Sequence, residues 1–343
     1  MAETGRNRDR ASKWSNFLDI PNRPMPIMGA TPRVEIWRKN KSSLWYYPAP
    51  KKKYSIPVFM IYSLINKPVI LDLGPGNSLI ESFTLAGFDV FLLDFGSPGY
   101  EDGSMTINDY ITDYVRRGVQ RALLHAGAQE ITVLGFCLGG TMAAMYAATA
   151  EEPIRNLILT VAPFDFSPAS YFDSIKQAVK DGQSQLNEYL DVQRTIPARE
   201  VEAGIRLMTS PVYYSPYLSL LNRADDPQYV ENWRRLNAWT KGHVPLTGGV
   251  IKQMLDDFIV HNRLISGTLR IQGKRANLAN IRSNVLIVAN KQDNLVPEEF
   301  IKPVLKKLKS ADVTYTLQNS GHAAGLLHSI PSFLKDWLTA RSM

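Results

Sequence analysis

The sequence predicts an α/β fold, in which a mostly parallel sheet is covered by helices on both faces and carries an inserted cap. Short β-branched and apolar runs, typical of buried strands, alternate with helical segments along most of the 343 residues. The alternation stops between about residues 166 and 280, where helical segments follow one another without a buried strand. We therefore expect a basic leader at 1–32, a core at 33–165 and 281–343, and a cap subdomain at 166–280.

Length and composition indicate a soluble globular protein with one large domain and an insertion, or with two domains. The content of 45% hydrophobic and 21% charged residues is ordinary for that class. A single cysteine cannot close an intrachain disulfide, so we expect a reducing compartment, the cytoplasm. The first twenty residues are polar and charged and predict no signal peptide. Residues 131–150 are uncharged, but their glycines, threonines and strand-like first half argue against a transmembrane segment.

Positive charge is concentrated near the N-terminus. Residues 1–53 hold twelve Lys/Arg and four Asp/Glu, and the remainder of the chain is close to neutral. Such a segment can meet an acidic partner protein, an anionic lipid surface, ligand phosphates or nucleic acid, and a solvated, partly disordered tail is equally consistent with it. It contains no nucleic-acid motif, so we expect no nucleic-acid partner.

The core elements can be placed in order along the chain. Residues 34–38 and 43–47 predict a hairpin at the sheet edge. The other predicted strands are residues 57–62, 88–94, 131–134, 156–161, 284–289 and 313–317. The predicted helices begin near residue 77 and cover residues 105–125, 142–148, 297–308 and 331–341.

The segment 130–142 predicts a nucleophile elbow, a sharp strand-to-helix turn that exposes a reactive side chain. Its G-x-C-x-G pattern places Cys137 between Gly135 and Gly139, where larger side chains would collide with the neighbouring strand and helix. A lone cysteine in an apolar segment is more often a core residue. The position of the sole thiol between the two elbow glycines favours a nucleophile instead.

A thiol nucleophile needs a base, and the base needs an orienting acid. In the α/β-hydrolase layout the acid comes next in the chain and the histidine last, each just past a late strand. Asp293 and His322 occupy such positions. Pro297 is a natural first helical residue, which predicts a cap at Val296 and leaves the Asp293 carboxylate free.

These three residue types together fit acyl transfer. The imidazole takes the thiol proton, and the carboxylate holds the ring tautomer. Backbone N–H groups of Leu138 and of the 63–66 loop, assigned to Ile65, are expected to form the oxyanion hole. A thiolate favours thioester substrates, because exchange between two thioesters is nearly balanced in energy.

Four segments carry a resemblance to a known family: G-F-C-L-G-G at 135–140, S-L-I-N-K-P-V-I-L-D-L-G-P-G-N-S-L at 63–79, F-D-V-F-L-L-D-F-G-S-P-G at 88–99 and A-P-F-D-F at 162–166. From about Thr31 onward the chain resembles polyhydroxyalkanoate synthases, most of all the catalytic subunits of two-component enzymes, class IV of the Bacillus type or class III. The resemblance implies an α/β-hydrolase fold and polymerisation of (R)-3-hydroxyacyl-CoA, most often 3-hydroxybutyryl-CoA, on a cysteine, with no metal and no cofactor.

The resemblance also implies residue roles and partners. Cys137, Asp293 and His322 match the nucleophile, acid and base, and either Trp233 or Trp239 matches a tryptophan that the family often carries in the cap. The implied partners are a second synthase subunit, the polyester chain and the surface of a cytoplasmic storage granule. A homo-oligomer is also consistent with the family.

Two other functions are consistent with parts of the sequence. A dienelactone-hydrolase-like cysteine esterase shares the G-x-C-x-G-G elbow and the residue order, but those chains are shorter and lack a cap of over a hundred residues. A non-enzymatic granule-surface scaffold is the weaker alternative, because all three triad positions are filled.

Overall fold

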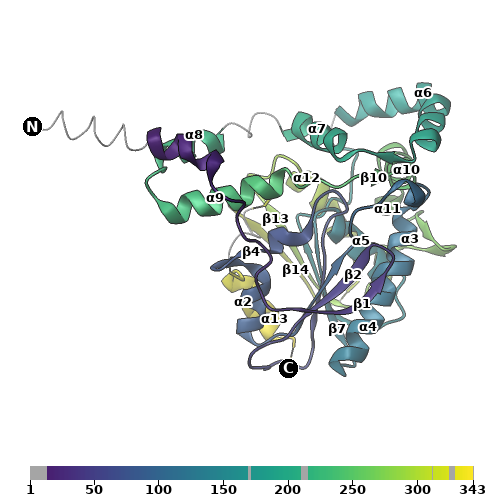
Figure 1. The fold of residues 1–343 in the computed structure, drawn as a ribbon. Coiled ribbons are helices and arrows are strands. Elements are labelled where there is room, and N and C mark those ends of the chain that lie inside the picture. The colour runs from purple at the N-terminus through teal and green to yellow at the C-terminus, as the bar shows by residue number, and fades with distance from the viewer. Residues whose placement is uncertain (1–13, 169–170, 210–214, 311, 324–328, 343) are drawn as a thin grey trace, which may run out of the picture.

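The computed structural model describes residues 14–168, 171–209, 215–310, 312–323 and 329–342 (Figure 1). Residues 1–13 of the expected leader, and residues 169–170 and 210–214 of the expected cap, lie outside this described part.

An eight-stranded sheet forms the centre of the molecule, in the order β1-β2-β6-β3-β7-β8-β13-β14. The strands are β1 (Val34–Lys39), β2 (Ser42–Tyr47), β3 (Val58–Ile61), β6 (Val90–Asp94), β7 (Ile131–Phe136), β8 (Ile154–Thr160), β13 (Asn284–Asn290) and β14 (Val313–Gln318). β1 and β2 pair antiparallel, and β2 runs antiparallel to β6. The other six strands of this sheet, β6, β3, β7, β8, β13 and β14, are all parallel to one another. The predicted parallel sheet with a hairpin at its edge is confirmed.

Helices cover both faces of this sheet, as the alternating pattern predicted (Figure 1). On one face α3 (Ile107–Asp109), α4 (Arg116–Ala126) and α5 (Leu138–Ala147) share an apolar cluster with side chains such as Phe59 and Val133. On the other face α2 (Leu79–Ala86) and α13 (Ser332–Thr339) share a cluster with Val58 and Leu134. Each buried strand thus alternates its side chains between two cores.

Two predicted helices differ in detail from the structure. The helix expected at 105–125 contains a π-helical stretch, Tyr110–Val115, between α3 and α4, and it ends at Gly127, whose φ of 61° favours glycine. The helix expected at 297–308 is α12 (Glu298–Ile301) followed by a 3-10 segment, Lys302–Lys306. Pro303 lacks an N–H and cannot continue the α-helical hydrogen bonds, which accounts for the tightening there.

The segment between β8 and β13 consists mainly of helices. They are α6 (Tyr171–Gln193), α7 (Ala198–Thr209), α8 (Ser215–Asn222), α9 (Pro227–Thr240), α10 (Gly248–Gln253) and α11 (Arg263–Ser266). The described residues of this segment add no strand to the eight-stranded sheet. Its second half belongs to the core, because Val250, Phe258 and Leu264 are buried in the same cluster as the sheet. The boundary expected at residue 280 therefore does not separate two packing units.

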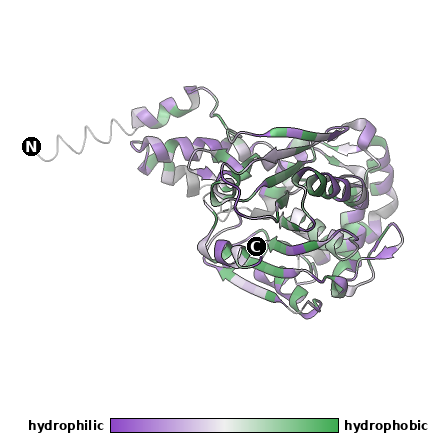
Figure 2. Cartoon of the chain, turned by 90° about the horizontal axis from the view of Figure 1, so that it is seen from below, coloured by the Kyte–Doolittle hydropathy of each residue, from purple (hydrophilic) through white to green (hydrophobic). Residues whose placement is uncertain are grey.

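A small module projects from the sheet domain at the left of Figure 1 and again in Figure 2, and it contains α8, α9 and the helical residues 14–19. Its apolar centre is a separate cluster of Ile20, Leu220 and Val230. Arg234 of α9 also donates a hydrogen bond to the carbonyl of Pro24. The described part of the leader is therefore packed against the inserted segment. In the part of the chain that is described, no helix is long and apolar enough to cross a membrane.

Candidate active site

Cys137 lies in the turn between β7 and α5 with φ 52° and ψ −128°. A positive φ is strained for a residue with a Cβ, and such strain is concentrated at functional sites. The turn is fixed by its backbone: the Cys137 N–H donates to the carbonyl of Thr160 at 3.0 Å, and its carbonyl accepts from Gly140 at 2.8 Å. The side chain remains partly exposed. The sequence pattern thus forms a strand, a sharp turn and a helix, with the thiol at the turn.

The elbow glycines are required by close backbone contacts. A Cβ on Gly135 would lie 2.5 Å from the Cα of Gly140, and a Cβ on Gly139 would lie 2.4 Å from the carbonyl oxygen of Ile61. Atoms this close cannot be accommodated without moving the backbone. The start of α5 is therefore pressed against the end of β3, which brings the loop after β3 next to Cys137.

Asp293 is buried, and both of its carboxylate oxygens are engaged. Oδ1 accepts the N–H groups of Leu295 at 2.9 Å and Val296 at 2.8 Å. Oδ2 lies 2.7 Å from His322 Nδ1. The expectation of a Val296 cap and a free carboxylate was wrong, because the N-cap of α12 is Pro297. Pro297 has no N–H, so Asp293 binds the two donors that precede it, and these bonds orient the carboxylate toward His322.

His322 lies between Asp293 and Cys137. Burial alone lowers the pKa of the His322 imidazole, but the charge of the Cys137 thiolate and the hydrogen bonds to Asp293 and Cys137 raise it to about 10. Because Nδ1 is occupied by Asp293, Nε2 is the nitrogen available to the thiol. The side chain is 24% exposed. The raised pKa keeps the His322 imidazole protonated near neutral pH, next to the Cys137 side chain.

All three residues lie at the edge where parallel strands end. Cys137 directly follows β7, Asp293 comes three residues after β13, and His322 comes four residues after β14. The carboxyl ends of parallel strands share one edge of a sheet, which is the usual place for a site in such folds. Residues nearly two hundred positions apart are therefore brought together by strand order.

Asn290 joins the loops that carry Asp293 and His322, and the sequence analysis did not identify it. Its side chain is 3% exposed and donates to the carbonyl of Gly321 at 2.8 Å. The backbone of Gln292 donates to Ser320 at 3.0 Å alongside it. An asparagine at the end of an otherwise apolar strand is the sequence signal that could have revealed this link.

The two N–H groups expected to form the oxyanion hole differ in their surroundings. Leu138 is the first residue of α5, where helical N–H groups have no partner within the helix. The Ile65 N–H instead donates to Ser63 Oγ at 3.3 Å, within its own loop. The Leu138 N–H is thus placed at the elbow, where it can donate to a substrate oxygen. The Ile65 N–H can do so only if its hydrogen bond to Ser63 breaks or is shared.

Tyr62 is a further neighbour of the thiol that sequence reasoning missed. Its side chain is 6% exposed and packs near Phe136, the residue before Cys137. Burial raises the pKa of Tyr62 well above its ordinary value, and the negative charge of Cys137 raises it further. Tyr62 therefore remains a neutral hydroxyl beside the nucleophile.

Of the two cap tryptophans, Trp239 is hydrogen-bonded to the loop after β3. Its Nε1 donates to the carbonyl of Lys67 at 3.0 Å, and its own carbonyl accepts from Asn66 Nδ2 at 3.2 Å. Trp233 packs instead on the separate cluster of the projecting module. The structure thus distinguishes two residues that the sequence left equivalent.

Comparisons with known proteins agree with this architecture. The family model for the alpha/beta hydrolase fold matches residues 71–329. A soluble variant of monoglyceride lipase from Saccharomyces cerevisiae has a TM-score of 0.57 at 14% identity, covering 94% of this chain and 100% of that one. A monoacylglycerol lipase from Paleococcus ferrophilus has a TM-score of 0.53 at 16% identity, covering 88% and 96%. These structures share the fold alone, and the predicted fold class is confirmed.

Several curated relatives are named poly(3-hydroxyalkanoate) polymerase subunit PhaC. The protein from Haloferax mediterranei is 31% identical over 92% of this chain, and the protein from Haloarcula marismortui is 28% identical over 94%. The chain spans 65% and 67% of the length of these two relatives. The protein from Allochromatium vinosum is 27% identical over 86% of this chain and 83% of its own length. The resemblance to polyhydroxyalkanoate synthases is confirmed.

Proposed function

This chain belongs to the alpha/beta hydrolase fold family, and we propose that within this family it is a poly(3-hydroxyalkanoate) polymerase acting through Cys137. It transfers (R)-3-hydroxyacyl groups, 3-hydroxybutyryl first among them, from coenzyme A thioesters to a growing polyester. The observation that carries the proposal is a cysteine at the strained elbow beside a hydrogen-bonded pair of His322 and the buried Asp293. The similarity to named polymerases over most of the chain supports the same activity.

Acylation begins with the thiolate. Cys137 Sγ attacks the thioester carbonyl, the new S–C bond forms, and the charge that develops on the oxygen is stabilised by the Leu138 N–H. The bond to coenzyme A then breaks, and the departing thiolate takes a proton from the His322 imidazolium. Asp293 keeps Nδ1–H in place and stabilises the imidazolium through the 2.7 Å hydrogen bond.

Chain extension reverses the proton path. His322, now neutral, accepts the proton of the hydroxyl of an incoming 3-hydroxyacyl-CoA as that oxygen attacks the acyl-cysteine carbonyl. An ester bond forms, Cys137 leaves as a thiolate, and the lengthened product is still a coenzyme A thioester. Attack of Cys137 on that thioester reloads the chain and releases coenzyme A.

We also propose a second synthase subunit and a place at the surface of a storage granule, as the resemblance implies. The basic N-terminal region and the module of residues 14–19, α8 and α9 offer a surface for such contacts, since Trp14 and Leu18 are exposed there. A homo-oligomer remains a further proposal. Each is checked by co-purification and by size measurement with and without the subunit.

The test of the activity is release of coenzyme A from (R)-3-hydroxybutyryl-CoA, measured with and without a partner subunit, together with analysis of the product. Coenzyme A release coupled to polyester supports the proposal, and Cys137→Ala removes both. Release of free 3-hydroxybutyrate without polymer, or cleavage of a dienelactone or aryl ester instead, identifies an esterase. An inert protein under all of these conditions contradicts an enzymatic role.

A further inference from the structure

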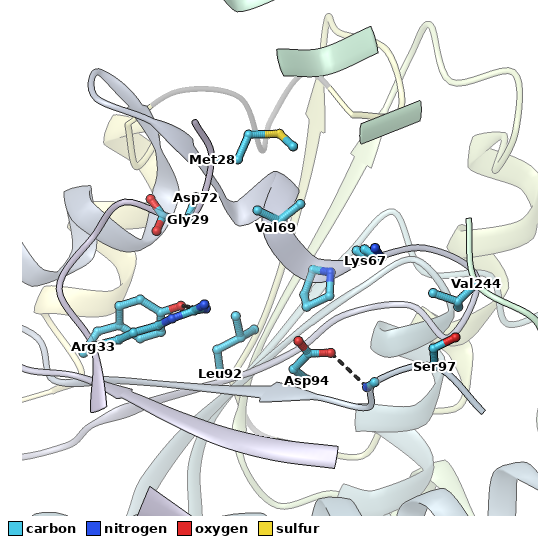
Figure 3. A pocket seen from close by; sticks show the side chains of 13 residues that line it. Met28, Gly29, Arg33, Lys67, Val69, Asp72, Leu92, Asp94, Ser97 and Val244 are labelled. Carbon is cyan, nitrogen blue, oxygen red and sulfur yellow. Dashed lines mark hydrogen bonds between the residues drawn. The ribbon is translucent and has the colours of Figure 1, made fainter. Parts of the chain in front are cut away.

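A cavity of about 230 Å³ lies at the ends of β3 and β6, the first and second strands along the sheet from β7 (Figure 3). Its walls come from four separate parts of the chain, and three of these are the segment before β1 (Met28, Arg33), the loop after β3 (Lys67, Val69) and the end of β6 (Asp94, Ser97). Val244 of the inserted segment completes the wall. Nothing in the proposed chemistry at Cys137 uses this cavity directly.

Two exposed cations border the cavity from opposite sides in Figure 3, Arg33 and Lys67. The Arg33 guanidinium lies 4.0 Å from the ring centre of Trp45 and donates to the Tyr47 hydroxyl at 3.1 Å, so its position is already restricted. Neither cation forms an ion pair with any residue that the structure describes. Both charges are available to an anionic ligand.

The two carboxylates of the same cavity already have donors. Asp72 accepts from the N–H of Thr31 at 3.0 Å and from its hydroxyl at 2.7 Å. Asp94 accepts the N–H of Gly96 at 2.9 Å, the bond drawn in Figure 3. These bonds orient both carboxylates toward neighbouring backbone and hydroxyl groups, and each carboxylate keeps its negative charge; Arg33 and Lys67 are the groups of this cavity that can bind an anion.

A narrow neck adjoins the cavity on the side of the loop after β3. It shares Pro68, Asp94 and Val244 with the cavity and is also lined by Tyr62 and Ser63. Its volume is about 10 Å³, the room of one water molecule. A hydrogen bond of 3.2 Å from the Val244 N–H to the Ile65 carbonyl lies across this region. A ligand reaching through the neck must move Val244 or the loop.

The spacing of the sheet sets the distance to be bridged. β6, β3 and β7 are neighbours, and strands lie about 4.8 Å apart, so the end of β6 is roughly 10 Å from the elbow after β7. The pantetheine arm of coenzyme A, which separates its thiol from its diphosphate, is longer than this. A thioester at Cys137 can therefore leave its phosphates at the cavity.

We propose that this cavity binds the phosphorylated end of the coenzyme A portion of the substrate, with Arg33 and Lys67 as the phosphate contacts. The inference rests on the proposed function, because only a coenzyme A thioester at Cys137 links the two places. Two guanidinium or ammonium contacts to phosphate are charge-assisted and screened by salt. They act on substrate binding and leave the chemistry at the thiol unchanged.

The test compares two substrates in two double variants. Arg33→Gln with Lys67→Gln removes both cations, and Arg121→Gln with Lys335→Gln removes the same charge from exposed positions outside the cavity. The substrates are (R)-3-hydroxybutyryl-CoA and the N-acetylcysteamine thioester of the same acid, which lacks every phosphate. We expect the cavity variant to raise KM for the coenzyme A ester about tenfold, with kcat and the short thioester unaffected. The control variant should change neither substrate.

Equal losses with both substrates, or no loss with either, overturn the proposal. Lys67→Gln alone guards against a folding defect at Arg33 and should raise KM for the coenzyme A ester by a smaller factor. Calorimetric binding of coenzyme A, pantetheine and ADP separates the sources of phosphate: coenzyme A should bind more tightly than ADP, and loss of both cations should weaken it. Tighter binding of ADP identifies a separate nucleotide site and contradicts the inference. An inactive wild-type protein refutes the proposed function instead, while the coenzyme A binding measurement still decides the site.

Discussion

The elbow and the inserted segment are both glycine-containing and helical, yet they tolerate very different changes. At the elbow a Cβ on Gly139 would lie 2.4 Å from a backbone oxygen of β3. In α7 a Cβ on Gly204 would meet nothing within 4 Å. The elbow is surrounded by buried strands, whereas α8 and α9 pack around a small cluster of their own. The packing around Gly139 therefore leaves no room for a side chain, whereas the surroundings of Gly204 do.

Alanine substitutions at Gly139 and Gly204 should show the largest difference in stability between the two regions. Gly139→Ala forces the elbow away from β3 and should destabilise the protein by about 3 kcal/mol with loss of activity. Gly204→Ala adds a helix former at an exposed position and should stabilise by about 0.5–1 kcal/mol with activity retained. Thermal unfolding and coenzyme A release measure both. If the two variants behaved alike, the contrast between the regions would be wrong.

Substitutions of Asp293 and His322 should affect the chemical steps more than folding. His322→Ala removes the proton carrier and should lower both acylation and polymer yield by roughly 10²–10⁴-fold. Asp293→Asn should retain some acylation of Cys137, because the carboxylate acts through His322 and, as the resemblance suggests, on the incoming hydroxyl. Single-turnover acylation and polymer yield separate the two steps. Near-wild-type yields from either variant would rule out the triad.

Replacing Cys137 should change the pKa of His322. Burial lowers the pKa of His322, but the thiolate and Asp293 raise it to about 10, so Cys137→Ala should lower that pKa measurably. A raised pKa adds stability that is complete below the unfolded value of about 6.5 and lost as pH rises toward 10. Histidine NMR titration of both proteins gives the shift. An identical His322 pKa in both proteins would show that Cys137 does not interact with the imidazole.

The two tryptophans of α9 offer the smallest and most local comparison. Trp239→Phe removes the hydrogen bond to Lys67 beside the loop after β3, and it should cost about 1 kcal/mol and change KM for the thioester. Trp233 packs on the cluster of the projecting module, so Trp233→Phe should leave KM unchanged. Steady-state kinetics of the two variants decide the matter, and a larger change in KM from Trp233→Phe would reverse the assignment.

The core was predictable because its signals are local. The turn from Gly135 to Gly139 can be recognised from five successive residues, because its two glycines and its cysteine have fixed spacing. The apolar runs identify the strands that bring Asp293 and His322 to one edge of the sheet. The roles of Asn290 and Tyr62 could not be read in this way. Their contacts depend on which loops lie side by side after folding.

The inserted segment was the least predictable part for the same reason. Its helices could be anticipated, but not that Phe258 and Leu264 join the main core while Trp233 joins a separate cluster. The rule that proline is often the first residue of a helix led to a wrong prediction for Asp293. Pro297 is the N-cap of α12 and has no N–H, and the Asp293 carboxylate accepts from the backbone that precedes it.

Mass spectrometry of the Cys137 peptide after mixing with (R)-3-hydroxybutyryl-CoA tests the central claim most directly. The proposed mechanism predicts a peptide heavier by whole 3-hydroxybutyryl units, bound as a thioester that hydroxylamine removes, and no adduct in Cys137→Ser under the same brief exposure. Polymer formation with an unmodified Cys137 peptide at every time point would contradict covalent catalysis at the elbow.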